Sequence, residues 1–84
     1  MSDLVTERVY LRTGKAIVTS ARAVLNDVTF FLANVTSVRM VKVGNNFAVL
    51  LVNGDRETSG LESEDKWEVK TIVDAIAQAI GARG

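Results

Sequence analysis

The 84-residue chain contains no cysteine, no histidine and no proline. The absence of cysteine excludes a disulfide framework and thiol chemistry. Because histidine is absent as well, the usual ligands of zinc and haem are missing. Histidine is also the commonest general base near neutral pH, so the usual partner of a nucleophilic side chain is missing too. We therefore expect no catalytic residue, no cofactor and no metal site, and we predict that the protein is not an enzyme.

Long hydrophobic runs and an excess of one charge are also absent. No apolar stretch approaches the roughly 20 residues that span a bilayer, and the N-terminal MSDLVTERVY lacks the basic and apolar regions of a signal peptide. We therefore expect a cytoplasmic protein. Ten basic residues balance ten acidic ones, which argues against a dedicated nucleic-acid binder. The length fits a single domain, 1–84, small enough that an oligomeric contact would help to stabilise it.

Two glycine turns organise the centre of the chain. Gly44-Asn45 has glycine first, as a type II′ hairpin turn requires, and Asn53-Gly54 is the pair preferred in a type I′ turn. Each turn separates runs rich in valine, leucine and other strand-forming residues. The sequence therefore predicts a three-stranded antiparallel meander, in which the two-residue loops fix the register.

Alternation along these strands divides the meander into a core face and an outer face. The core face carries Val38, Met40, Phe47, Val49, Leu51 and Thr58. The outer face carries Arg39, Val41, Val43, Ala48, Leu50, Val52, Asp55, Glu57 and Ser59. The predicted register places Leu50 between Arg39 and Glu57, and it places Leu51 opposite Arg56. Because the outer face is more apolar than a solvated sheet face, we expect something to cover part of it.

Short strands before the meander and a helix after it complete the pattern. Asn26-Asp27 is a third candidate for a two-residue turn, and the strands extend over about 8–60. Beyond them the hydrophobic period becomes about 3.6, which predicts a helix over about 64–80 with Ser63 as N-cap and Gly81 as its stop. Its apolar stripe consists of Val69, Ile72, Val73, Ile76 and Ile80. The fold class is α+β, mainly β, with six to seven strands and one C-terminal helix.

This order of elements and three sequence stretches carry a family resemblance. The stretches are VTSAR at 18–22, LANVTSVR at 32–39 and DKWEVKTIVDAIAQAI at 65–80. Over roughly residues 8–80 the chain resembles an uncharacterised family of small bacterial PH-like (GRAM-like) domain proteins. The resemblance implies a bent antiparallel half-barrel capped by the helix, and it implies no activity. Such relatives often carry membrane-spanning segments after the strand equivalent to 37–43, where this chain has Gly44-Asn45 instead.

One cationic cluster flanks a glycine turn. Arg12 and Lys15 enclose Thr13-Gly14, and Arg22 follows nearby in the sequence. In PH domains the loop between the first two strands is where anionic lipid headgroups bind, and lysine and arginine suit phosphate groups. The alternative function is therefore a peripheral binder of anionic lipid headgroups or another phosphorylated ligand at a membrane surface. The competing interpretation is an ordinary solvated hairpin end.

The leading hypothesis is a non-enzymatic protein-interaction module that self-associates, most simply as a dimer. Its predicted interface is the outer-face strip of Val41, Leu50 and Val52, bordered by Arg39 and Glu57. A two-fold axis would bring Arg39 of one copy towards Glu57 of the other. In the competing interpretation, Leu4 and Val5 or a neighbouring loop pack back over the strip.

Trp67 is a further candidate for a partner interface. The helical period places it opposite the apolar stripe, exposed on the first turn, where a tryptophan is a candidate for partner binding. The alternative is that its ring folds back over the rim of the barrel.

Overall fold

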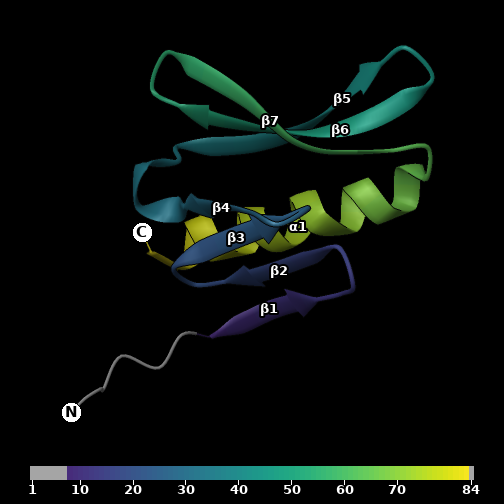
Figure 1. Ribbon diagram of the computed structural model, residues 1–84. Coiled ribbons are helices and arrows are strands. Elements are labelled where there is room, and N and C mark those ends of the chain that lie inside the picture. Colours follow the sequence, from purple (N-terminus) through teal and green to yellow (C-terminus); the bar gives the residue numbers. More distant parts are fainter. Residues whose placement is uncertain (1–7, 84) are drawn as a thin grey trace.

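The computed structural model describes residues 8–83, which form two antiparallel sheets and one C-terminal helix (Figure 1). The first sheet has the order β1-β2-β3-β4 and the second has the order β5-β6-β7. The elements are β1 (Val9–Arg12), β2 (Ala16–Thr19), β3 (Arg22–Leu25), β4 (Val28–Phe31), the 3-10 turn η1 (Leu32–Asn34), β5 (Ser37–Val43), β6 (Asn46–Asn53), β7 (Arg56–Ser63) and α1 (Lys66–Arg83). The predicted class, mainly β with one C-terminal helix, is confirmed.

Two of the three predicted turns form where the sequence places them. Asn26 and Asp27 both have positive φ, 54° and 69°, as the central residues of a type I′ turn require. Gly44 has φ 60°, which suits the first central position of a type II′ turn. The register across Gly44 is also as predicted, with Met40 opposite Val49.

The third turn forms one residue later than predicted. Its loop residues are Gly54 and Asp55, because Asn53 still pairs with Arg56 at the strand ends. Only Gly54 has positive φ, 63°, so the turn needs the left-handed conformation at glycine alone and leaves Asn53 in the strand. The predicted type I′ turn at Asn53-Gly54 is therefore wrong. Leu51 faces Thr58 and not Arg56.

A bulge in β7 changes which face of the sheet the side chains after it lie on. Ala48 pairs with Glu62 and Leu50 pairs with Ser59, so Gly60 and Leu61 together lie opposite Val49. Because of the extra residue, Leu61 faces the core and is only 2% exposed. Glycine fits closely beside it, since a Cβ at position 60 would lie 2.6 Å from the Cδ1 atom of Leu25 and would force that side chain to shift. The bulge thus lets β7 approach the first sheet closely.

The helix begins and ends later than the sequence predicted. Asp65 is the N-cap, because its Oδ1 accepts the backbone N–H groups of Trp67 (3.0 Å) and Glu68 (3.3 Å). Ser63 belongs to β7, and its Oγ accepts the backbone N–H of Asp65 at 3.1 Å. The predicted cap at Ser63 is therefore wrong. Gly81 does not end the helix, which continues through it; a single exposed glycine costs a helix only about 1 kcal/mol.

The core lies where α1 packs between the two sheets (Figure 1). The helix contacts β1 and β2 of the first sheet and all three strands of the second. Val69, Ile72 and Ile76 of the predicted stripe are buried, and Val73 and Ile80 pack at the edge of the core. From the second sheet the core takes Val49 and Leu51, with Val38 and Met40 partly buried against them. The predicted packing of helix on core face is confirmed.

Candidate interaction surfaces

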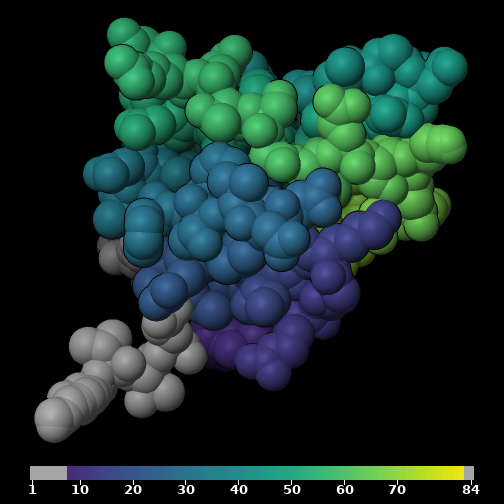
Figure 2. Space-filling view, viewed as in Figure 1, coloured from purple at the N-terminus to yellow at the C-terminus, as the bar shows by residue number. Residues whose placement is uncertain are grey.

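The outer face of the second sheet points away from α1 (Figure 1). Alternation places the whole predicted strip, Val41, Leu50 and Val52, on this face, and each of the three side chains is half-buried. Ala48 lies between them opposite Val41 and is completely buried, yet it does not belong to the core cluster. The ends of the sheet bend away from the helix, and Figure 2 shows a notch between its two hairpin ends. The outer face is therefore concave, with an apolar centre on β5 and β6 and polar side chains on β7.

Two opposite charges lie together on this face. The Nη2 atom of Arg39 and the Oε2 atom of Glu57 are 2.8 Å apart, joining the two edge strands across β6. Both side chains stay largely exposed, at 61% and 53%. We expected this pair between two copies, whereas the structure forms it within one chain. The predicted neighbour of Leu50 also changes: Leu50 faces Ser59, and Glu57 faces Val52, as the later turn requires.

No element among residues 8–83 covers the outer face. The helix packs on the inner side of the sheet, and the first sheet lies beyond the helix (Figure 1). Leu4 and Val5, the alternative cover, lie outside the described residues. Arg8, the first described residue, precedes β1, at the edge of the first sheet far from the second (Figure 1).

Trp67 is exposed on the first turn of α1. Its exposed fraction is 71%, the largest among the large hydrophobic side chains that the structure describes. The alternative, in which the ring folds over the rim of the barrel, is not the arrangement found. Because α1 packs against the inner side of the sheet, Trp67 does not belong to the outer face. It is a separate exposed position on α1.

The three predicted anion-binding residues do not lie together. Arg12 ends β1 and Lys15 precedes β2, so both flank the first hairpin. Arg22 begins β3, at the other end of the four-residue strand β2, roughly 13 Å away along the sheet. The Nζ atom of Lys15 is already 3.5 Å from the Oε1 atom of Glu68 on α1, an oxygen that is shielded from solvent. The three residues therefore do not form one site. Binding of anionic ligands stays a prediction.

Three acidic residues around the start of α1 make separate interactions. Asp65 caps the helix, Glu68 faces Lys15, and Glu62 accepts a hydrogen bond from the Asn46 side-chain amide at 3.4 Å. Across the described part of the chain, no three such side chains are grouped so that they could hold a metal ion. Also within that part, no helix is long and apolar enough to span a membrane.

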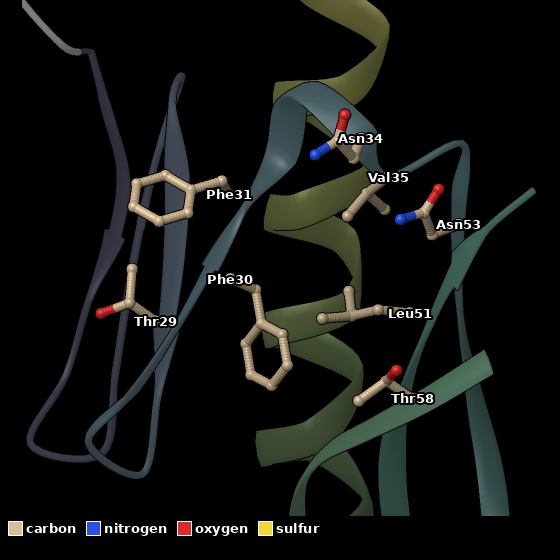
Figure 3. Close-up of a pocket in the computed structure, with 8 residues that line it drawn as sticks. All are labelled: Thr29, Phe30, Phe31, Asn34, Val35, Leu51, Asn53 and Thr58. Carbon is tan, nitrogen blue, oxygen red and sulfur yellow. The ribbon is translucent and has the colours of Figure 1, made fainter. Parts of the chain in front are cut away.

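A crevice between the two sheets was not predicted from the sequence (Figure 3). Its volume is about 260 Å³, and it opens between β4 and the β6–β7 hairpin. Its lining consists of Thr29, Phe30, Phe31, Asn34, Val35, Leu51, Asn53 and Thr58, none of them charged. The crevice forms between elements about 20 residues apart in the sequence, so no local pattern predicts it. The only sequence feature that points to it is the absence of charge in Val28–Phe31.

Comparison with known proteins adds no further assignment. No family model, no curated protein and no solved structure matches this chain. Any functional interpretation must therefore come from its surfaces, among them the outer face of β5–β7.

Proposed function

We propose that this chain is a non-enzymatic, PH-like protein-interaction module that forms a homodimer through the outer face of its second sheet. The PH-like part is supported by the element order, with sheets of four and three antiparallel strands followed by a helix that packs on both. The non-enzymatic part is supported by the composition, which has neither histidine nor cysteine.

One observation carries the dimer proposal: the second sheet has apolar side chains on both faces of β5 and β6, and α1 covers only one of these faces. In an antiparallel sheet with a solvated face, that face is normally polar. Here it presents Val41, Leu50 and Val52, with Ala48 at the centre. A second copy of the same face would remove this strip from water at about 25 cal/mol per Å² of apolar area.

The charges on the outer face favour a second copy over a charged partner. Arg39 and Glu57 neutralise each other within one chain. Glu62, opposite Ala48, adds one carboxylate, which accepts a hydrogen bond from the Asn46 amide, so like charges do not cluster around the apolar strip. A two-fold axis pairs such a patch with itself. The same pair would rim an apolar centre, which is the usual anatomy of a specific interface.

The size of the face sets the expected affinity. Three strands about 4.8 Å apart, each about 26 Å long, give a flat area of roughly 370 Å². Standard interfaces bury about 800 Å² per partner, so this contact belongs to the small class. We therefore expect dissociation in the micromolar range, which concentration-dependent measurements can follow.

The test is the mass in solution of a Leu50→Glu variant, measured by light scattering after size exclusion. A carboxylate at the centre of the interface should reduce the dimer to a folded monomer, since a buried charge without a partner is strongly unfavourable. The matched control is Ala77→Glu, which adds the same charge at an exposed position of α1 and should leave the dimer intact. A wild-type protein that is monomeric at high micromolar concentration would contradict the proposal.

A further inference from the structure

β4 is a short open sheet edge that lacks charge, proline and a bulge. The two sheets end in the four edge strands β1, β4, β5 and β7. Charged side chains or irregularities mark the other three: β1 contains Arg12 and a register shift, β5 contains Arg39 and Lys42, and β7 contains charges and a bulge. Such features block pairing with foreign strands. β4, with the sequence VTFF, has no charge, no proline and no bulge.

The backbone of β4 presents its free hydrogen-bonding groups at this edge. The N–H of Leu32 donates to the carbonyl oxygen of Ala21 at 3.0 Å. This bond shows which backbone groups on the β4 side of the hairpin point towards β3. In an antiparallel pair this phase alternates. Thr29 and Phe31 are out of phase with Leu32, so their N–H and C=O groups point away from β3. In the described part of the chain no strand pairs with them on that side.

The crevice lies directly beside these free groups (Figure 3). Phe30, Val35 and Leu51 give it an apolar interior, and Asn34, Asn53 and the two threonines give it a neutral polar rim. Its volume of about 260 Å³ is below the roughly 300–1,000 Å³ typical of small-molecule sites. The space therefore suits one large side chain better than a cofactor.

We propose that β4 binds an extended, uncharged peptide segment of a partner protein as an additional strand. The segment pairs with the N–H and C=O groups of Thr29 and Phe31, and one large apolar side chain enters the crevice. The neighbouring side chains of the segment alternate to the other face, beside the ring of Phe31, which is 63% exposed. Main-chain hydrogen bonds supply affinity and the crevice supplies selectivity, as in other cases of strand addition.

A second copy of the chain is a poorer occupant of this edge. Its own β4 would have to place Phe30 in the crevice, but that ring already packs against the core of its own chain. The charge-free lining likewise gives no group that would select a charged peptide. The proposal is independent of the dimer, because the crevice and the outer face use opposite sides of the β6–β7 backbone at Leu51 and Leu50.

The test uses a seven-residue acetylated and amidated peptide of alternating threonine and valine with a central phenylalanine. Binding is measured by fluorescence anisotropy of a labelled form and by amide chemical shifts of the protein. We expect shifts at Thr29, Phe31, Leu51 and Thr58, and at least a tenfold weaker affinity when the central phenylalanine is replaced by alanine. No binding up to millimolar peptide, or equal binding of the alanine peptide, would overturn the proposal.

Thr29→Pro separates strand addition from simple hydrophobic contact. Proline removes the N–H that points to the open edge, and edge strands tolerate it there. We expect at least a tenfold loss of peptide affinity, whereas Thr29→Val, which keeps the N–H, should change it less than threefold. A Thr58→Phe variant, which fills the crevice from an exposed position of β7, should also lose binding.

The variants also distinguish the peptide from a second copy. Unchanged affinity in both Thr29→Pro and Thr58→Phe would overturn the proposal. A wild-type dimer that Thr29→Pro dissociates and Leu50→Glu does not would assign β4 to a second copy, and it would overturn both the peptide occupant and the proposed dimer. If Thr29→Pro loses peptide binding while its mass in solution equals that of the wild type, the result supports strand addition at β4. This holds whether or not the outer face forms a dimer.

Discussion

Arg39 and Glu57 join the two edge strands of the second sheet across β6, with 2.8 Å between Nη2 and Oε2. They lie in adjacent rows of the sheet, because Arg39 is opposite Leu50 while Glu57 is opposite Val52. The contact is diagonal because the second hairpin turns at Gly54-Asp55 and so places Glu57 opposite Val52. It places a closed charge pair over the apolar strip, so the charged groups need no second chain to be neutralised.

The first prediction uses this pair to separate contacts within a chain from contacts between chains. Arg39→Glu and Glu57→Arg each place like charges together, and each should change the free energy of unfolding by no more than about 1 kcal/mol, since the pair is exposed. Mixing the two variants should not restore any lost dimer, because each chain still holds its own like-charged pair. Recovery of dimer mass in the mixture, measured by light scattering, would mean that the pair acts across the interface.

The second prediction concerns the bulge in β7. Gly60→Ala places a methyl group 2.6 Å from the Cδ1 atom of Leu25, a side chain with no exposed surface. Overpacking of this kind costs about 1–3 kcal/mol. Urea unfolding followed by circular dichroism should show that loss.

Gly81→Ala is the matched control for that substitution. Gly81 lies in the exposed last turns of α1, and no atom is within 4 Å of an added Cβ. The same chemical change should therefore stabilise the protein by about 0.5–1 kcal/mol through helix propensity. Equal effects of the two substitutions would show that the close approach of β7 to Leu25 is wrong.

The third prediction tests how the helix packs. Ile76 has no exposed surface and belongs to the core between the sheets. Ile76→Asp should destabilise the fold by roughly 3–5 kcal/mol, because it removes a large apolar side chain and buries a charge. Ala77→Asp, at the next and exposed position, should cost less than about 1 kcal/mol. Similar melting temperatures for the two variants would refute this orientation of the helix.

The fourth prediction tests the start of the helix. Asp65→Ala removes the acceptor for the N–H groups of Trp67 and Glu68 and should cost about 1 kcal/mol. Asp65→Asn keeps an acceptor oxygen and should recover most of that loss. Thermal unfolding of both variants provides the comparison. If Ser63→Ala cost as much as Asp65→Ala while Asp65→Asn recovered nothing, the cap would lie at Ser63.

Local signals in the sequence predicted most of the fold. Gly44 and the pair Asn26-Asp27 specify their turns through the conformations that they tolerate, and the apolar stripe of the helix specifies its buried face. Asn53-Gly54 was ambiguous, because glycine can occupy the first or the second central position of a two-residue loop. In the structure Asn53 pairs with Arg56, so Gly54 takes the first position, and Leu61 reaches the core only through the bulge at Gly60. That contact is tertiary, so no local pattern reveals it.

The candidate surfaces were predictable to different degrees. Alternation alone placed Val41, Leu50 and Val52 on one face, and the helical period alone placed Trp67 outside the core. The predicted register already placed Arg39 and Glu57 on either side of Leu50, whereas their ion pair within one chain was not predicted. The crevice beside β4 depends on how the first sheet meets the second. No hydrophobic periodicity in the sequence predicts how two sheets pack against each other.

Cross-linking of a single introduced cysteine tests the central claim most directly, because the chain has no cysteine of its own. Leu50→Cys places one thiol at the centre of the proposed interface, and Gln78→Cys places one on the exposed side of α1. With a short bismaleimide cross-linker at high micromolar protein, we predict a covalent dimer of about twice 9.1 kDa for Leu50→Cys, suppressed by excess wild-type chain. Gln78→Cys should stay monomeric. Equal cross-linking of the two variants, or none at Leu50→Cys, would contradict self-association through the outer face.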